Sequence, residues 1–270
     1  MEPTATSIWE AVTAIRRQAP LVHNITNYVV MNNTANALLA LGASPVMAHA
    51  ENEASEMAVL AGALVVNIGT LSDPWIRAMR LAVPAARARH IPVVLDPVGA
   101  GATAYRTQTV RELISLGPPT ILRGNASEIM AVHQDEARTK GVDSAAASST
   151  ALAAARAIHQ RHGCIVSISG ETDYVVHEGG TLAIRNGHPM MPRVTGLGCT
   201  ASALCGAFAA VERDAALATA AAMAVMGVAG EMAAEGCPGP GSFQVRFLDA
   251  LYSLTEEDLR RRLRIAPENG

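Results

Sequence analysis

The stretch Val194-Thr195-Gly196-Leu197-Gly198-Cys199-Thr200-Ala201-Ser202-Ala203-Leu204 combines two closely spaced glycines with an apolar run that contains no proline. This pattern predicts a tight turn leading directly into a buried helix, because glycine tolerates positive φ and lets a ligand approach the backbone. The first N–H groups of a helix have no partner within it, and the helix dipole favours negative charge there. The stretch therefore predicts a site for a phosphoryl group or a developing oxyanion, with Cys199 at its mouth.

Two interpretations of this stretch stay open on its residues alone. At a predicted helix start, the helix end would lower the pKa of the Cys199 thiol and make it reactive. Alternatively, the glycines form a turn that binds nothing, and Cys199 is a small core residue. A short glycine motif by itself does not separate the two.

Strands and helices alternate along the rest of the chain. Short apolar strands are predicted at 44–48, 63–68, 91–95 and 164–170, and helices at 6–18, 31–41, 51–61, 73–90 and 151–162. This alternation indicates an α/β fold, with a mainly parallel central sheet flanked by helices on both faces. A hairpin at 173–184 adds antiparallel strands on the C-terminal side. Ligands bind beyond the carboxyl ends of parallel strands, so Met47, Gly69, Asp96 and the glycine turn are expected along one edge.

Prolines and glycines predict several local features. Asp73 is expected to cap a helix that has Pro74 in its first turn, and Pro84 should kink or interrupt that helix. Residues 137–149 show no clear period and predict a surface connection. Residues 238–241 predict a loop, and the chain beyond them is expected to be helical.

The overall composition indicates a folded domain. Of the 270 residues, 50% are hydrophobic and 17% are charged, which argues against disorder. A single domain over residues 1–270 is large enough for a substantial core. The net charge is −3, so the chain has no excess of basic residues to bind nucleic-acid phosphates. Only 3% of the residues are aromatic, which leaves few rings on which bases could stack. No nucleic-acid partner is therefore expected.

The cysteines and apolar stretches predict a reducing, cytoplasmic setting. Cys164, Cys199, Cys205 and Cys237 form no C-x-x-C pair and no zinc-finger spacing with a histidine. The first ten residues lack a basic segment followed by an apolar one, so no secretion signal is expected. The most apolar run, 215–230, is shorter than the ~20 residues of a membrane span and predicts a packed interior helix.

Several polar residues at predicted strand ends have both a structural and a chemical interpretation. Asp96 follows an apolar strand, as a Mg²⁺ ligand does, but it can equally cap the next turn. Asn125 and Glu128 have capping-box spacing, while Glu128 and Arg123 could also organise Mg²⁺ and phosphate. Asn27 belongs to a segment of buried-looking amides, which either brace the backbone or face a small heteroaromatic ligand.

Seven motifs, in order along the chain, closely resemble the hydroxyethylthiazole kinase family, a thiamine-salvage branch of the ribokinase-like enzymes. They lie at 21–27, 42–47, 67–71, 96–102, 123–128, 195–199 and 239–243. The match runs from about Pro20 to Asp249, and seven ordered motifs are far more specific than one glycine turn.

This resemblance implies transfer of the ATP γ-phosphoryl group to the primary alcohol of 4-methyl-5-(2-hydroxyethyl)thiazole, with Mg²⁺ as the metal. It implies thiazole binding by Asn27, Met47 and Gly196, nucleotide binding by Arg123 and Ser169, and Mg²⁺ held by Asp96 and Glu128, in part through water. The family more often has Thr where Ser169 stands, and the hydroxyl is kept. The family also implies a homotrimer with active sites between subunits.

Cys199 stands where most ribokinase-like enzymes carry an Asp base, although a Cys is usual within the closer family. The resemblance therefore implies a catalytic role for Cys199, as a weak base or as a group that positions the alcohol. In a loose transition state the alcohol loses its proton late, so a weak base can suffice.

Three other functions are consistent with parts of the pattern. A ribokinase-like kinase for hydroxymethylpyrimidine or pyridoxal would share the fold, but the segments around Asn27 and Met47 weigh against it. A non-catalytic thiazole or nucleotide sensor would not need Asp96 and Arg123. A cysteine hydrolase would need a base near Cys199, and His188, the closest histidine in sequence, is not placed there by any motif.

Overall fold

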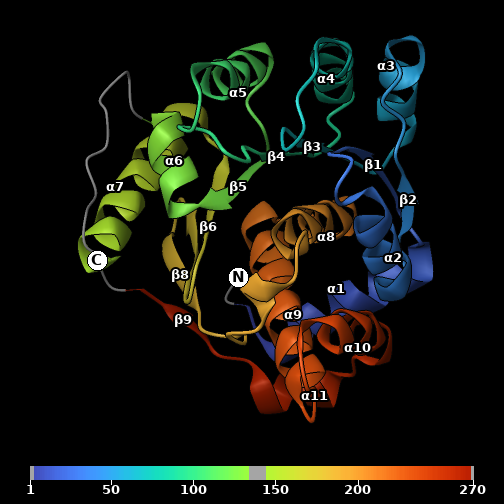
Figure 1. Cartoon of the computed structure of the whole chain (residues 1–270), viewed down its shortest axis with the longest axis vertical. Helices are drawn as coiled ribbons and strands as arrows, with labels where there is room; N and C mark the ends of the chain where they lie inside the picture. Colours follow the sequence, from blue (N-terminus) through green and yellow to red (C-terminus); the bar gives the residue numbers. More distant parts are fainter. Residues whose placement is uncertain (1–2, 134–143, 269–270) are drawn as a thin grey trace.

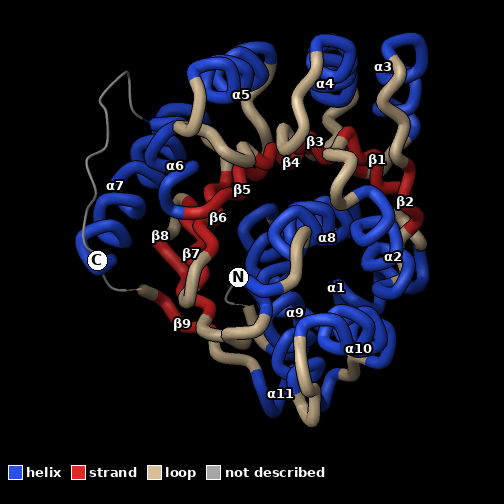
Figure 2. The backbone as a smooth tube through the Cα atoms, viewed as in Figure 1, coloured by secondary structure: helices blue, strands red, loops and turns tan. Residues whose placement is uncertain are grey.

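The computed structural model describes residues 3–133 and 144–268. One nine-stranded sheet runs through these residues in the order β2-β1-β3-β4-β5-β6-β7-β8-β9 (Figure 2). The strands are β1 (Leu21–Ile25), β2 (Ser44–Val46), β3 (Ala63–Asn67), β4 (Val93–Asp96), β5 (Ile121–Asn125), β6 (Ile165–Ser169), β7 (Asp173–His177), β8 (Gly180–Ile184) and β9 (Ile265–Pro267).

The first six strands pair in parallel, and the last three add to the sheet antiparallel. The predicted mainly parallel sheet with antiparallel strands on the C-terminal side is therefore confirmed. The parallel register pairs Asn67 with Asp96 and Asn125 with Ser169, so polar residues of neighbouring strands end at the same level. This level forms the carboxyl edge of the sheet.

Helices cover both faces of the sheet, as expected (Figure 1). One face carries α3 (Glu51–Leu60), α4 (Asp73–Ala88), α5 (Ala104–Leu116), α6 (Ala126–His133) and α7 (Ser144–His162). The other face carries α1 (Ala5–Gln18), α2 (Met31–Leu41), α8 (Leu197–Val211), α9 (Ala215–Ala234), α10 (Pro240–Ser253) and α11 (Glu256–Arg262). A 3₁₀ turn, η1 (Met191–Arg193), precedes α8. Each face of the sheet has its own cluster of buried apolar side chains.

The two most apolar helices, α8 and α9, lie in the core of the second layer. Helix α8 packs on β1, β3 and β4 as well as on α9. Among the described residues, α9 is the one helix long and apolar enough to cross a membrane, and 78% of its most apolar window is buried inside the fold. This burial confirms the expectation of an interior helix for residues 215–230.

Two details of α4 differ from expectation. The N-cap is Ser72, so Asp73 is already helical, and Pro84 does not interrupt the helix. Pro84 and Arg80, whose carbonyl loses its helical partner, are both exposed, so water can replace that hydrogen bond.

The boundaries of two further helices and one strand also differ from expectation. Helix α7 begins at Ser144 within the expected connection, and residues 137–143 lie outside the described residues. Helix α10 starts at Pro240, a favoured first helical residue, inside the expected loop. The short strand β9 near the chain's end was not expected, because three residues paired to one edge of β8 carry no period of their own.

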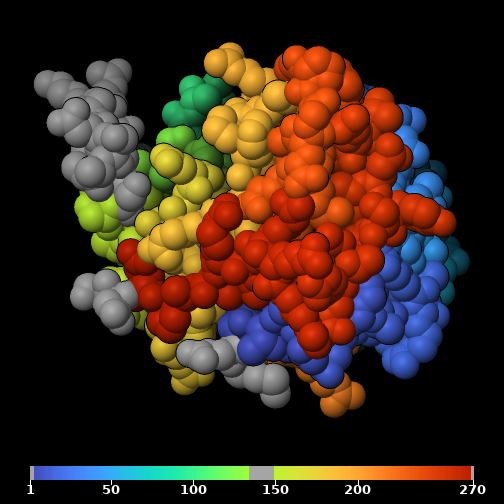
Figure 3. All heavy atoms as spheres, turned by 90° about the horizontal axis from the view of Figure 1, so that it is seen from below, coloured from blue at the N-terminus to red at the C-terminus, as the bar shows by residue number. Residues whose placement is uncertain are grey.

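On the face shown in Figure 3, the C-terminal helices (orange to red) lie beside the N-terminal helix α1 (blue). Arg16 of α1 donates hydrogen bonds to the carbonyls of Leu251 and Tyr252 at 3.2 and 2.9 Å. Thr6 bonds Glu256 of α11. These hydrogen bonds join α1 to α10 and α11 on the face of the sheet that also carries α8 and α9.

Candidate active site

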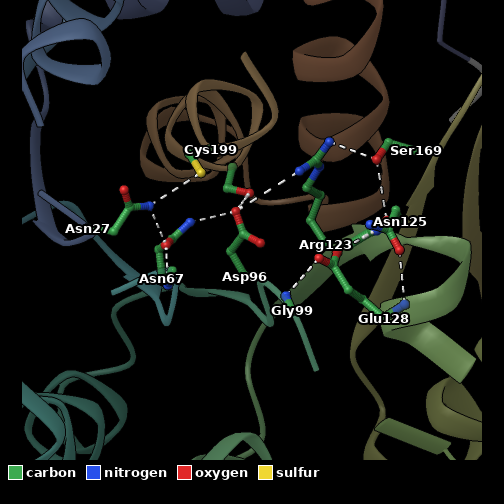
Figure 4. A network of polar contacts seen from close by, with 12 residues as sticks. Asn27, Asn67, Asp96, Gly99, Arg123, Asn125, Glu128, Ser169 and Cys199 are labelled. Atoms are coloured by element: carbon green, nitrogen blue, oxygen red, sulfur yellow. Dashed lines mark hydrogen bonds and ion pairs between the residues drawn. The ribbon is translucent and has the colours of Figure 1, made fainter. Parts of the chain in front are cut away.

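Three buried polar side chains meet at the carboxyl edge of the sheet. Asn27 lies just beyond β1, Asn67 ends β3 and Asp96 ends β4, and their exposed fractions are 4%, 1% and 1%. Polar groups buried this deeply need partners, and these residues bond one another. Asn27 Nδ2 donates to Asn67 Oδ1 at 2.9 Å, and Asn67 Nδ2 donates to Asp96 Oδ2 at 2.8 Å (Figure 4).

The Asp96 carboxyl group is unevenly satisfied. Its Oδ2 accepts hydrogen bonds from Asn67 and from the Ser202 hydroxyl of α8 at 2.7 Å, and Arg123 lies 4.0 Å from the same oxygen. Its Oδ1 is buried and has no hydrogen-bond partner in the described part of the chain. Burial raises the pKa of Asp96 to about 6, although Arg123 and the two donors oppose the shift.

These oxygens fit Mg²⁺, which takes carboxylate and water ligands. Asp96 offers the unpartnered Oδ1. Glu128 accepts from the N–H groups of Gly99 (2.9 Å) and Asn125 (2.8 Å) with one oxygen each, so its remaining lone pairs suit contact through water. The described residues contain no group of three or more His, Cys, Asp and Glu side chains that could hold a metal. A metal here would therefore complete its shell with water and phosphate.

The capping interpretation of Glu128 is confirmed and coexists with this chemistry. Asn125 Oδ1 accepts from the Glu128 N–H at 2.9 Å, and Glu128 accepts from the Asn125 N–H, which completes the reciprocal pair. The same carboxylate holds the turn after β4 through Gly99. Glu128 thus joins the ends of two neighbouring strands beside Asp96.

Arg123, on β5, carries a buried charge with few partners. One of its terminal nitrogens donates to Ser169 Oγ at 2.7 Å, while its Nε is buried without a partner among the described residues. Asp96, at 4.0 Å, is too distant for a hydrogen bond. A buried guanidinium with unused N–H donors is suited to binding an anion.

The glycine turn at the start of α8 completes the site. Gly196 adopts φ +86°, and a Cβ there would lie 2.8 Å from Val30. A Cβ on Gly198 would lie 3.1 Å from the guanidinium of Arg123, so this glycine lets the cation reach the turn. No side chain caps α8. Its free N–H groups and Arg123 therefore face one spot, which suits a phosphoryl group.

Cys199, in the first turn of α8, accepts a hydrogen bond from Asn27 Nδ2 at 3.5 Å. Burial, followed by the charge of Asp96, raises the pKa of Cys199 to about 11. The expectation that this pKa is lowered was wrong, because desolvation and the Asp96 carboxylate outweigh the hydrogen bonds from Asn67 and Asn27 and the charge of Arg123, which lower it. At neutral pH the side chain is a thiol.

The remaining candidates lie around this network. Met47 follows β2 at the same edge, where His49 bonds its carbonyl at 3.1 Å, and His23 bonds the carbonyl of Ala48 at 2.7 Å. His188 accepts from the N–H of Met190 and stacks on Phe243, and no contact with Cys199 was found.

Three residues of the network were missed from the sequence: Asn67, Ser202 and Arg106. Asn67 ends an apolar strand just as Asp96 does, so the same signal could have found it. Ser202 resembles any small residue of an apolar helix. Arg106 donates to the carbonyls of Ile68, Gly69 and Val98, which holds the turns after β3 and β4, and no motif marked it.

Comparison with known proteins gives the family. The sequence model of the hydroxyethylthiazole kinase family matches residues 12–257. A protein named hydroxyethylthiazole kinase from Syntrophus aciditrophicus is 64% identical over 266 residues, which cover 98% of each chain. The chain belongs to the hydroxyethylthiazole kinase family. A second relative of that name, from Vibrio campbellii, is 57% identical over 96% of this chain and 97% of its own.

Solved structures agree with this family and with the fold. The structure of a hydroxyethylthiazole kinase protein from Pyrococcus horikoshii matches with a TM-score of 0.90 and 43% identity, covering 98% of this chain and all of that one. A Staphylococcus aureus pyridoxal kinase matches with a TM-score of 0.61 at 15% identity, covering 78% and 87%. The latter likeness concerns the fold alone, and the expected ribokinase-like fold of this kinase family member is confirmed.

Proposed function

We propose that this chain transfers the γ-phosphoryl group of ATP to the primary alcohol of 4-methyl-5-(2-hydroxyethyl)thiazole, as a kinase of thiamine salvage. The observation that carries the proposal is the meeting of three incompletely satisfied groups in a member of this family. They are the unpartnered oxygen of Asp96, the sparsely paired guanidinium of Arg123 and the uncapped start of α8. Phosphoryl transfer requires charge stabilisation and positioning of this kind.

Each candidate residue takes a role in this reaction. Asn27, Met47 and Gly196 bind the thiazole, Arg123 and Ser169 bind the nucleotide, and Asp96 and Glu128 hold Mg²⁺. The metal supplies neutralisation of charge on the phosphate oxygens. Arg123 and the N–H groups of the Gly196–Cys199 turn stabilise charge on the transferring group.

Cys199 acts as a neutral thiol that positions the acceptor. The alcohol oxygen forms the new bond to the γ-phosphorus as the bond to the departing ADP oxygen breaks. In a loose transition state the alcohol proton leaves late, so it can pass to an oxygen of the phosphoryl group as that group is transferred. With its pKa at about 11, Cys199 is overwhelmingly protonated at neutral pH, so its contribution is contact with the alcohol through the thiol.

Three broader properties belong to the same proposal. Residues 1–270 act as one kinase domain, the enzyme works in the cytoplasm, and it forms a homotrimer with sites between subunits. Tyr28 and Val29 support the last point, because they directly follow Asn27 and are 63% and 68% exposed. Apolar side chains so close to a site are suited to contact with a neighbouring subunit.

The test is ADP release from Mg-ATP in parallel reactions with hydroxyethylthiazole, hydroxymethylpyrimidine, pyridoxal or no acceptor. We expect release that depends on the thiazole alcohol and that is about a hundredfold slower in the Asp96→Asn variant. Release with another alcohol instead would overturn the acceptor and leave the phosphotransfer chemistry. Binding of thiazole or ATP without any ADP release would show a sensor rather than a kinase.

A further inference from the structure

Three hydrogen bonds to Gly69, Asn27 and Asp96 fix the amide of Asn67, which also lies within hydrogen-bonding reach of Cys199. Its Oδ1 accepts from the Gly69 N–H and from Asn27 Nδ2, both at 2.9 Å, and its Nδ2 donates to Asp96 Oδ2 at 2.8 Å. A backbone N–H can only donate, so the atom that faces Gly69 must be the amide oxygen. The orientation of Asn67 is therefore set by the main chain, and its nitrogen must face Asp96.

This orientation determines what Asn27 can do. Because Asn67 presents an oxygen, Asn27 must present its nitrogen, whose two hydrogens are directed to Asn67 Oδ1 and to Cys199 Sγ at 3.5 Å. The oxygen of Asn27 accepts no hydrogen bond within the described residues and points away from Asn67 in Figure 4. Asn27 thus offers a ligand an acceptor and no donor.

The surrounding turn is built closely around the two amides. A Cβ on Gly69 would lie 2.5 Å from Asn27 Nδ2 and 2.9 Å from Asn67 Oδ1, so the backbone closes directly over them. Arg106 holds this turn by donating to the carbonyl of Gly69 at 3.0 Å. The amide pair has little room to rotate, which is what preorganisation of a contact requires.

We propose that Asn67 is a positioning residue that locks Asn27 as a hydrogen-bond acceptor for the acceptor's hydroxyl group. The proposal rests on the proposed function, in which Asn27 contacts the acceptor. A ring nitrogen of a neutral thiazole is itself an acceptor and has nothing to take from Asn27. A hydroxyl group can donate to the free oxygen, so the pair selects an alcohol over the same ring without its hydroxyl.

The test measures binding rather than turnover. Dissociation constants for hydroxyethylthiazole and for 4-methyl-5-ethylthiazole are measured by calorimetry without ATP or Mg²⁺. One neutral hydrogen bond predicts that the wild type binds the alcohol about 3- to 10-fold more tightly. In Asn67→Leu, which keeps the branched arrangement of heavy atoms but cannot hydrogen-bond, the Asn27 amide is released and this ratio falls to about 1 to 2.

Ser202→Ala is the matched control. It removes the other donor to the same oxygen of Asp96 and leaves the contact between Asn67 and Asn27 intact. We expect it to lower turnover and to keep the alcohol preference. A purely structural role of Asn67 in holding Asp96 would instead make the two variants behave alike.

Asn67→Asp covers the case in which the leucine variant does not fold. Its carboxylate still accepts from Gly69 and Asn27, so the alcohol preference persists, while its charge beside Asp96 reduces turnover. In an Asn27→Ala background, substitution of Asn67 has no further effect on the ratio. An undiminished alcohol preference in Asn67→Leu, or loss of the preference in Asn67→Asp, overturns the inference. A wild type that binds no thiazole, yet phosphorylates another alcohol, overturns the proposed function, and the pair of ligands becomes that alcohol and its deoxy analogue.

Discussion

Helices α8 and α9 are neighbours of similar apolar character, but they begin in opposite ways. The N-cap of α9 is Asp214, whose carboxylate accepts from the N–H groups of Ala216 and Leu217 at 2.9 and 3.2 Å. The N-cap of α8 is Gly196, which offers no side-chain cap, and the first turn lies beside Arg123. Both helices have the same orphan N–H groups at their first turn. At α9, where no ligand is expected, the carboxylate of Asp214 caps the N–H groups. At α8, where we propose that a phosphate binds, no side chain takes that position.

The largest effect on activity is expected when α8, like α9, is given a carboxylate at its first turn. In Gly198→Asp, the new side chain would pair with Arg123 and place negative charge where we propose that the γ-phosphoryl group binds. We expect kcat/KM for ATP to fall about a thousandfold, in the upper range for loss of an oxyanion-stabilising group. Steady-state kinetics at varied ATP measure this.

Gly198→Asn separates charge from size in this experiment. Asparagine has the shape of aspartate without its charge, so we expect a smaller loss, about tenfold, because a Cβ at this position meets Arg123 at 3.1 Å. Gly198 is exposed, so both variants should fold. Equal losses in the two variants would mean that crowding, rather than charge, controls the start of α8.

A second change tests the sheet side of α8, where Asp96 bonds Ser202. In Asp96→Asn we expect turnover to fall about a hundredfold and the free energy of unfolding at pH 7.5 to rise by about 3 kcal/mol. The pKa of Asp96 is raised from 3.8 to about 6 by burial, so the folded state holds the proton more tightly than the unfolded state. Stability from this group is complete below pH 3.8 and is lost as the pH rises through about 6.

The pH dependence decides this prediction. The stability gain of Asp96→Asn over wild type should shrink as the pH falls from 7.5 toward 4, in urea titrations without metal. Burial also raises the pKa of Asp173 to about 6, so the difference between the two proteins is the quantity to follow. A constant difference across this range would contradict the raised pKa of Asp96.

The third prediction concerns the first turn of α8 itself. Cys199→Ala should lower kcat by about tenfold, because we propose that the thiol contacts the alcohol, and Cys199→Asp should stay active. With the pKa of Cys199 raised to about 11, we expect no inflection from this group in kcat between pH 6 and 9. A kcat of Cys199→Ala equal to wild type would remove Cys199 from the reaction.

Much of the fold and part of the site could be predicted from the sequence, for physical reasons that particular residues show. The alternation of apolar runs specifies the parallel sheet, and residues at the ends of parallel strands must lie at its carboxyl edge, which placed Gly69 and Asp96 together; the position of Asn27 at the same edge was not predicted from this pattern. Sequence spacing cannot give desolvation, so the pKa of Cys199 was expected to shift in the wrong direction. Ser202 and Arg106 act through contacts set by packing between distant segments, and no local pattern marks them.

The smallest expected effect lies at the start of α9, and it is the control for all the others. Asp214→Ala removes a cap that bonds two N–H groups and should lower the free energy of unfolding by about 1 kcal/mol. In a chain of this size that is a drop in Tm of about 2 to 4 °C, with kcat and KM unchanged. Thermal unfolding and kinetics on the same preparation measure both. If Asp214→Ala lowered turnover as strongly as changes at Gly198, the two helix starts would not differ in function, and the open end of α8 would be no more than a glycine turn.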